Sequence, residues 1–321
     1  AIEYKYLGAD MIGGFFCFGL LAFLGSYLWY RAVAEAIPFV NRRMFCALLF
    51  FAPSLAFWPS SIGKEALMQL GFGLFALGVA KLLQHRLLNA ALVAVPGGWL
   101  LWVVRPHLLA LAMAAGAVAY FAARSPKHMG ASTRASLLRP VGLILMALLL
   151  VFAASSAAET FGMKDFSLTS IENELNYATG QSEQGNSEFQ TGNNSITPLS
   201  AAEGLVTVLL RPWPWEVDSA YQILASLESF VFAMLIVLRF SSVSYSLTRW
   251  RAAPFLLYAW VTLLLYAVTF SSFSNFGLLV RQRSLVLPAL FVVLSIDPVL
   301  ARRSEARDRS DTEPGGADAY A

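Results

Sequence analysis

Charged residues are scarce in this chain. Asp, Glu, Lys and Arg make up 13% of its 321 residues, whereas soluble domains contain about 25%. Hydrophobic residues account for 57% of the sequence. This balance excludes an ordinary soluble globular domain and indicates an integral membrane protein.

Cysteine and histidine are also rare. The two cysteines, Cys17 and Cys46, both lie in apolar segments, so they define no disulfide framework. The three histidines, His85, His107 and His128, fall in no HExxH or Cys/His ligand spacing. We therefore expect no metal site in this sequence.

The first ten residues, AIEYKYLGAD, lack the basic region and apolar core of a signal peptide. Because the chain opens on Ala1 rather than Met, we expect a fragment or a processed form whose upstream part is missing. We expect no cofactor, unless that upstream part contains an acidic site that binds a divalent metal.

Long apolar stretches dominate what is present. A hydrocarbon core of about 30 Å needs about 20 apolar residues in helix, with about 17 as the lower limit. By this measure the fold is an all-α transmembrane bundle of about nine spans, of which the second contains Pro53 and is kinked or only partly inserted. The predicted spans are 11–30, 44–59, 65–83, 87–104, 106–123, 140–157, 219–238, 253–270 and 284–300.

Four regions follow from these spans. They are spans one to six within 1–157, an extracytoplasmic loop with an interfacial segment at 158–218, spans seven to nine within 219–300, and a disordered cytoplasmic tail at 301–321.

The apolar run 87–123 is too long for one crossing, since its 37 residues would extend about 55 Å as a helix. Proline disfavours helical conformation in the residue before it. Arg105-Pro106 in the middle of the run therefore predicts the turn of a helical hairpin.

The basic residues set the expected orientation. Sixteen of the 23 fall in alternate loops on one side, which the positive-inside rule makes cytoplasmic. This places the N-terminus of the chain outside and the C-terminus inside. The outer side keeps the other seven, which are Lys5, Lys64, Arg105, Lys164, Arg211, Arg281 and Arg283.

Five of the outer cations lie at the mouth of a predicted span, against the charge bias of the other loops. They are Lys64, Arg105, Arg211, Arg281 and Arg283. Ionisable residues at this depth are candidates for function. If the mouths converge, the five form a cationic surface suited to a phosphate or diphosphate, which arginine binds bidentately. The alternative is that each contacts a lipid headgroup.

Three residues are candidates for acid–base chemistry. His107 follows Arg105 directly and could exchange protons near neutral pH, or it could be purely structural. Glu65 lies beside Lys64 and could act in catalysis or simply pair with that lysine. Glu216 belongs to the acidic outer loop, in which a carboxylate could activate an acceptor hydroxyl.

The segment AAEGLVTVLLRPWPWE is apolar but too short to cross the membrane, so we expect it to be interfacial or re-entrant. Trp213 and Trp215 suit the headgroup level as membrane anchors, or they could serve as a platform for a sugar. Glu228 lies within the seventh predicted span and should face the bundle interior or a wet cavity.

Four blocks carry a resemblance to a known class of protein. In chain order they are FWPSSIGKEAL, VVRPH, TVLLRPWPWE and SNFGLLVRQRSLVLP. They resemble polytopic bacterial membrane proteins of cell-surface polysaccharide loci, and more broadly O-antigen polymerases and membrane glycosyltransferases that use polyprenyl-linked sugars. The resemblance implies a multi-pass enzyme of the bacterial inner membrane, with Arg105, Arg211, Arg281 or Arg283 handling the lipid-diphosphate donor at the outer face.

The resemblance also implies partners. These are the polyprenyl-linked glycan, membrane lipids and other polysaccharide assembly proteins, without nucleic acid. One feature departs from membrane glycosyltransferases of the mannosyltransferase type, whose catalytic acid lies in the first outer loop. Here that region offers only Glu3 and Asp10.

Two other functions stay open. A transporter or flippase for a lipid-linked or anionic solute would use the same cations for binding and Glu228 for coupling. A non-catalytic scaffold of a polysaccharide assembly complex would tolerate their loss. The sequence contains no convincing internal repeat of the kind common in transporters, which favours the enzyme.

Overall fold

A computed structural model describes residues 11–123, 173, 198–217, 219–303 and 306, and all named elements in these ranges are helices. Four are long and apolar enough to cross a membrane. They are α2 (Met11–Ala36), α5 (Lys64–Leu83), α6 (Leu87–Val104) and α14 (Phe276–Leu294). A fifth span is possible if α11 (Ala220–Leu238) and α12 (Phe240–Thr248), which are bent by 68°, count as one.

The structure therefore supports a membrane-embedded helical protein, but not all nine predicted spans. Three apolar helices are shorter: α7 (Pro106–Ala122), α10 (Pro198–Leu210) and α13 (Phe255–Phe270). The predicted span 140–157, most of the predicted outer loop and most of the predicted tail lie outside the described residues.

The second predicted span is broken. Helix α3 (Arg42–Phe51) ends before Ala52, which is extended at φ −65° and ψ 122°, and α4 (Pro53–Phe57) follows at once. Pro53 explains the break, because it has no N–H to donate and disfavours helical conformation in Ala52. The kink expected at this proline is confirmed.

The predicted hairpin is also confirmed. Helix α6 ends at Val104 and α7 begins at Pro106, and Arg105 between them is extended at φ −154° and ψ 95°. The N–H of Arg105 donates to the carbonyl of Leu101 at 2.7 Å, which closes the last turn of α6.

The last predicted span begins too late at residue 284, because α14 begins at Phe276. The side chain of Asn275 accepts hydrogen bonds from the N–H groups of Gly277 and Leu278 and so caps the helix. Arg281 and Arg283 consequently lie within α14 rather than in a loop before it.

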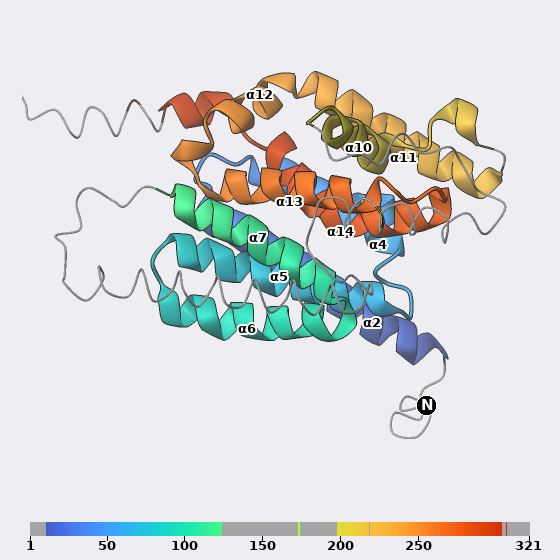
Figure 1. The fold of residues 1–321 in the computed structure, drawn as a ribbon, viewed down its shortest axis with the longest axis horizontal. Helices are drawn as coiled ribbons and strands as arrows, with labels where there is room; N and C mark the ends of the chain where they lie inside the picture. The colour runs from blue at the N-terminus through green and yellow to red at the C-terminus, as the bar shows by residue number, and fades with distance from the viewer. Residues whose placement is uncertain (1–10, 124–172, 174–197, 218, 304–305, 307–321) are drawn as a thin grey trace, which may run out of the picture.

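Helix α14 is the centre of the fold. Sixteen of its 19 residues are buried. It packs against α13 and also contacts α3, α4, α5, α10, α11 and α12. Figure 1 shows α13 and α14 between the α10–α12 side and the α5–α7 side of the bundle. At its C-terminal end, Arg239 donates to the carbonyls of Leu294 and Ile296 at 3.1 and 2.7 Å.

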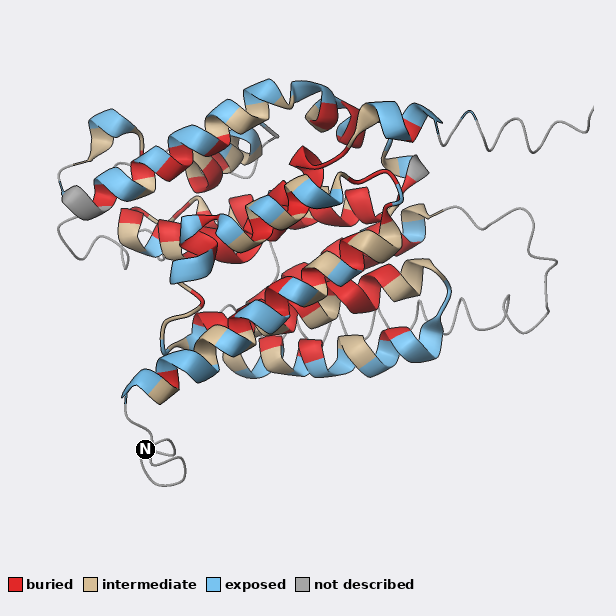
Figure 2. Ribbon diagram, turned by 180° about the vertical axis from the view of Figure 1, so that it is seen from behind, coloured by how far each residue is buried: buried red, intermediate tan, exposed pale blue. Residues whose placement is uncertain are grey.

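The outer helices present apolar side chains away from this centre. Figure 2 shows buried residues gathered along the inner helices and exposed ones along the outward sides of α6 and α11. Leu88 and Val95 of α6 are 73% and 67% exposed, and Val237 of α11 is 74% exposed. Apolar side chains on an outward helix surface suit contact with lipid.

Small residues bring α2 and α5 together. A Cβ added at Gly25 of α2 would fall on the backbone carbonyl of Gln69, and one added at Gly73 of α5 would fall on that of Gly25. Glycine allows this close backbone approach, which is how helices commonly associate within membranes.

Replacing Gly25 by Ala should destabilise the protein by about 1 to 3 kcal/mol, the usual cost of overpacking, despite the better helix propensity of Ala. Thermal unfolding of the purified protein in detergent would measure this loss. Gly19→Ala in the same helix is the control, since its Cβ would lie 3.9 Å from Ser60 Cβ. Equal stability of the two variants would contradict the close approach.

Candidate functional site

Three successive residues of α14 organise the predicted site. Arg281, Gln282 and Arg283 point in different directions, because each residue of an α-helix is rotated by about 100° from the one before. Each meets a different part of the fold. We call these three residues the RQR segment.

Arg281 pairs with Glu65, the second residue of α5. Its Nε donates to Oε1 at 2.6 Å and its Nη2 to Oε2 at 2.7 Å, which makes a bidentate ion pair. Glu65 is completely buried, whereas the Arg281 side chain is 37% exposed. The partner of Glu65 is thus an arginine 216 residues away rather than its neighbour Lys64.

Gln282 connects the RQR segment to the α6–α7 hairpin. Its side-chain oxygen accepts a hydrogen bond of 2.6 Å from Nη1 of Arg105. Its backbone carbonyl accepts another, of 2.8 Å, from the hydroxyl of Tyr266 in α13. The half-buried Arg105 is therefore held by a neutral amide, and no carboxylate in the described ranges forms an ion pair with it.

Arg283 is fully buried and pairs with Glu228 of α11, with 3.0 Å between Nη2 and Oε2. Its Nη1 donates to the hydroxyl of Ser229 at 2.6 Å and to the carbonyls of Leu209 and Arg211, both at 3.2 Å. Burying a guanidinium is costly unless acceptors surround it. These acceptors tie α14 to the end of α10 and to α11.

Glu228 is 8% exposed, which confirms that it faces the protein interior. Its Oε1 accepts from both the N–H and the hydroxyl of Ser54, each at 2.9 Å. Ser54 is the second residue of α4, where the backbone N–H has no partner within the helix. Glu228 thereby joins α11 to the helix that follows the break at Pro53.

The segment RPWPWE closes on itself. Arg211 donates from Nε to Oε2 of Glu216 at 3.1 Å and from Nη2 to Oε1 at 2.6 Å, and the N–H of Trp213 donates to Oε2 at 2.9 Å. The rings of Trp213 and Trp215 stack with 5.5 Å between centroids and 6° between planes. Trp215 is 78% exposed. Membrane anchoring and sugar binding both stay predictions for this pair.

His107 is the second residue of α7, two positions beyond Arg105. It is half-buried, and its ring centroid lies 6.4 Å from that of Phe270 in α13. Within the described ranges, no three His, Cys, Asp or Glu residues are grouped as a metal site would require.

The structure thus links the predicted residues in a way that the sequence did not reveal. Each candidate carboxylate has its own arginine: Glu65 with Arg281, Glu216 with Arg211, and Glu228 with Arg283. Of the five predicted cations, the two without an ion pair among the described residues are Lys64 and Arg105.

Four residues that contribute to this region are not indicated by the sequence alone. They are Gln282, Ser54, Ser229 and Tyr266. The polar run RQRS inside an otherwise apolar helix was the available signal for Gln282. No comparable signal marks the serines, because single serines are common in membrane helices.

Comparison with known proteins adds no assignment: no family model, no curated protein and no solved structure matches this chain.

Replacing Arg283 by Ala should destabilise the protein by about 3 to 5 kcal/mol, because Glu228 would be left buried without a cation. Thermal unfolding in detergent and the amount of protein in membranes would measure the effect. Arg283→Met combined with Glu228→Gln should recover most of the loss, because the variant then contains neither of the two buried charges.

The matched control is Arg43→Ala, which removes an exposed arginine that forms no ion pair in the described part of the chain. A double variant as unstable as Arg283→Ala would argue against the ion pair as the source of the effect.

Proposed function

We propose that this chain is a membrane enzyme that transfers a glycan from a polyprenyl-diphosphate carrier at the outer surface of a bacterial inner membrane. The observation that carries the proposal is the surplus of positive charge around the RQR segment. Among the residues that the structure describes, five cations and three carboxylates contribute to this region, and each of these carboxylates is paired with an arginine. Lys64 and Arg105 remain to bind an anionic ligand.

The two cations without a described ion pair are both connected to the Arg281–Glu65 pair through neighbouring residues of the chain. Lys64 directly precedes Glu65, which binds Arg281, and Arg105 binds Gln282, which directly follows Arg281. Lys64 is exposed and Arg105 is half-buried, so both are open to a ligand approaching this end of α14. A diphosphate suits them, because it carries several charged oxygens that arginine and lysine bind well.

In the proposed reaction, an acceptor hydroxyl attacks the anomeric carbon of the carrier-linked sugar. The bond between that carbon and the diphosphate oxygen breaks, and polyprenyl diphosphate leaves with the bonding electrons. Lys64 and Arg105 stabilise the negative charge that develops on the leaving group. His107, in the first turn of α7, takes the proton of the acceptor.

The other two acid–base candidates receive a different role in this proposal. Both oxygens of Glu65 are bonded to Arg281, and both oxygens of Glu216 are bonded to Arg211. These carboxylates position arginines and are not in contact with substrate.

A transporter for a lipid-linked or anionic solute is the second candidate. The Arg283–Glu228 pair favours it, since ion pairs inside membrane helices often belong to transport pathways. A non-catalytic scaffold is the third. The three functions differ in where lipid-linked glycan collects when the site is damaged.

In cells that depend on this protein, Lys64→Ala and Arg105→Ala should each shorten the surface glycan and cause lipid-linked units to accumulate on the outer leaflet. Glycan length on gels and leaflet-specific labelling of the precursors would measure this, with membrane levels checked by blot. Arg302→Ala, which changes an exposed arginine in the C-terminal region, is the control. Accumulation on the inner leaflet would indicate transport, and normal glycan in both variants would leave only the scaffold.

Gln282→Glu should reduce the affinity for undecaprenyl diphosphate by about 10-fold or more without removing a cation. The new carboxylate would pair with Arg105, and a charged hydrogen bond lost to the ligand is worth about 1.5 to 3 kcal/mol. Gln282→Met is the matched control, since it frees Arg105 from its amide partner without adding a charge. Equal affinity of the Glu variant and the native protein in vesicle binding would exclude Arg105 from the site.

A further inference from the structure

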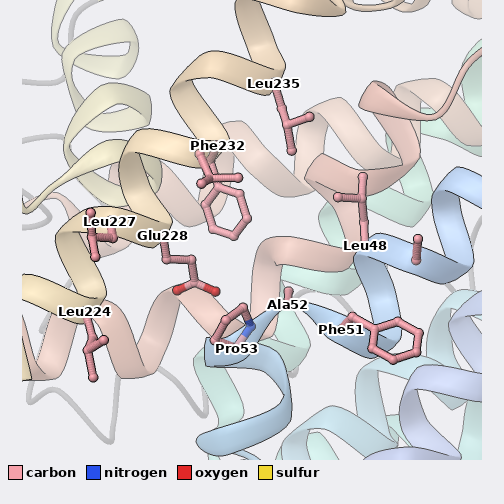
Figure 3. Close-up of a pocket in the computed structure, with 11 residues that line it drawn as sticks. Leu48, Phe51, Ala52, Pro53, Leu224, Leu227, Glu228, Phe232 and Leu235 are labelled. Atoms are coloured by element: carbon pink, nitrogen blue, oxygen red, sulfur yellow. The ribbon is translucent and has the colours of Figure 1, made fainter.

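A groove of about 430 Å³ lies between the broken helix α3–α4 and α11 (Figure 3). Ten of its eleven lining residues are apolar, and Glu228 is the one that can ionise. Leu48 and Phe51 belong to one wall, and Leu227 and Phe232 belong to the other.

Hydrogen bonds within the protein fix the walls of this groove. Ser54, next to the break, donates twice to Oε1 of Glu228, and Arg283 donates to Oε2. The guanidinium of Arg283 also lies 5.5 Å from the centroid of the Phe232 ring. Both carboxylate oxygens are therefore engaged with protein, and the groove exists without needing a ligand to form it.

The chemistry of the lining selects an apolar occupant. A buried water needs two to four polar partners, whereas apolar cavities stay dry, and one of about 150 Å³ is enough for a benzene molecule. The groove is nearly three times that size, which leaves room for part of a single hydrocarbon chain.

The edges of the groove show how such a chain would enter. Phe51 is 81% exposed, Leu224 68% and Val231 44%, so the mouth is bordered by apolar side chains on the outward surface of the bundle. In a membrane this surface faces lipid. A chain can move in sideways from the hydrocarbon core without crossing water.

Helix α14 connects the groove to the proposed diphosphate site. Arg283 supports the groove wall through Glu228. Arg281 binds Glu65, which is next to Lys64, and Gln282 binds Arg105. We propose that the groove binds the isoprenoid chain of the polyprenyl-diphosphate carrier, an inference that rests on the proposed function. The carrier would then be held at both ends, its diphosphate by cations and its tail by α3, α4 and α11.

Photolabelling of the full chain in vesicles of phosphatidylethanolamine and phosphatidylglycerol tests this directly. The probe is undecaprenyl diphosphate with a diazirine in its isoprenoid chain, and the crosslinked peptides are identified by mass spectrometry. Labels should concentrate on residues 47–53 and 224–235. Labels spread over α2 and α6, or the same pattern from phosphatidylglycerol with a diazirine in its acyl chain, would overturn the proposal.

Filling the groove gives a second measurement. Leu227→Trp and Ala47→Trp each place a large ring in it and should lower labelling of the α11 peptide by at least 10-fold. Leu88→Trp on the exposed side of α6 is the matched control and should label like the native protein. Undiminished labelling in both groove variants would overturn the proposal, and the native labelling pattern remains decisive if either variant fails to fold.

The outcomes separate this inference from the proposed function. Arg105→Ala should weaken probe affinity yet leave the labelled positions unchanged, because the tail site would persist. If cells without this protein make normal glycan while the groove is labelled specifically, the enzyme proposal fails and the chain-binding groove stands. If glycan transfer is found and the labels lie elsewhere, the groove proposal fails alone.

Discussion

A fully buried arginine requires the surrounding fold to supply acceptors for it. Arg283 finds them in Glu228, Ser229 and the carbonyls of Leu209 and Arg211. These groups come from α11 and from the end of α10, and Glu228 reaches on to Ser54 at the start of α4. Four segments of the chain are thereby positioned by the desolvation of one side chain. The packing around α14 depends on this network remaining complete.

The basic residues of this region form two groups, according to whether a carboxylate pairs with them. Arginines that pair with a carboxylate have a structural role. They are Arg283 in the core, Arg281, whose partner Glu65 lies at the start of α5, and Arg211 in its short turn. Lys64 and Arg105 have no such partner in the described ranges, and Arg105 is oriented by the neutral side chain of Gln282. In the proposed function, an anionic ligand balances these two charges.

Part of this arrangement could be predicted from the sequence. Proline affects the backbone of its own and the preceding residue, so its effect can be predicted from the local sequence. The predicted break at Pro53 and the predicted hairpin turn at Arg105-Pro106 are both present in the structure. The predicted start of the last span, at residue 284, is too late. Arg281 and Arg283 lower the hydropathy of this stretch, although buried carboxylates pair with both of them inside the protein. Those partners lie 216 residues away for Arg281 and 55 for Arg283, and a single sequence carries no sign of such pairing.

Both ends of α14 are fixed by guanidinium groups. Near one end the RQR segment binds three neighbouring parts of the bundle, and at the other Arg239 binds the carbonyls of Leu294 and Ile296. Sliding this helix by one turn, about 5.4 Å, would break all of these bonds together. A rearrangement that keeps these bonds would therefore leave α14 in place and move the helices around it. In the proposed function, entry of the carrier would then involve the outer helices, with α14 as the fixed part of the bundle.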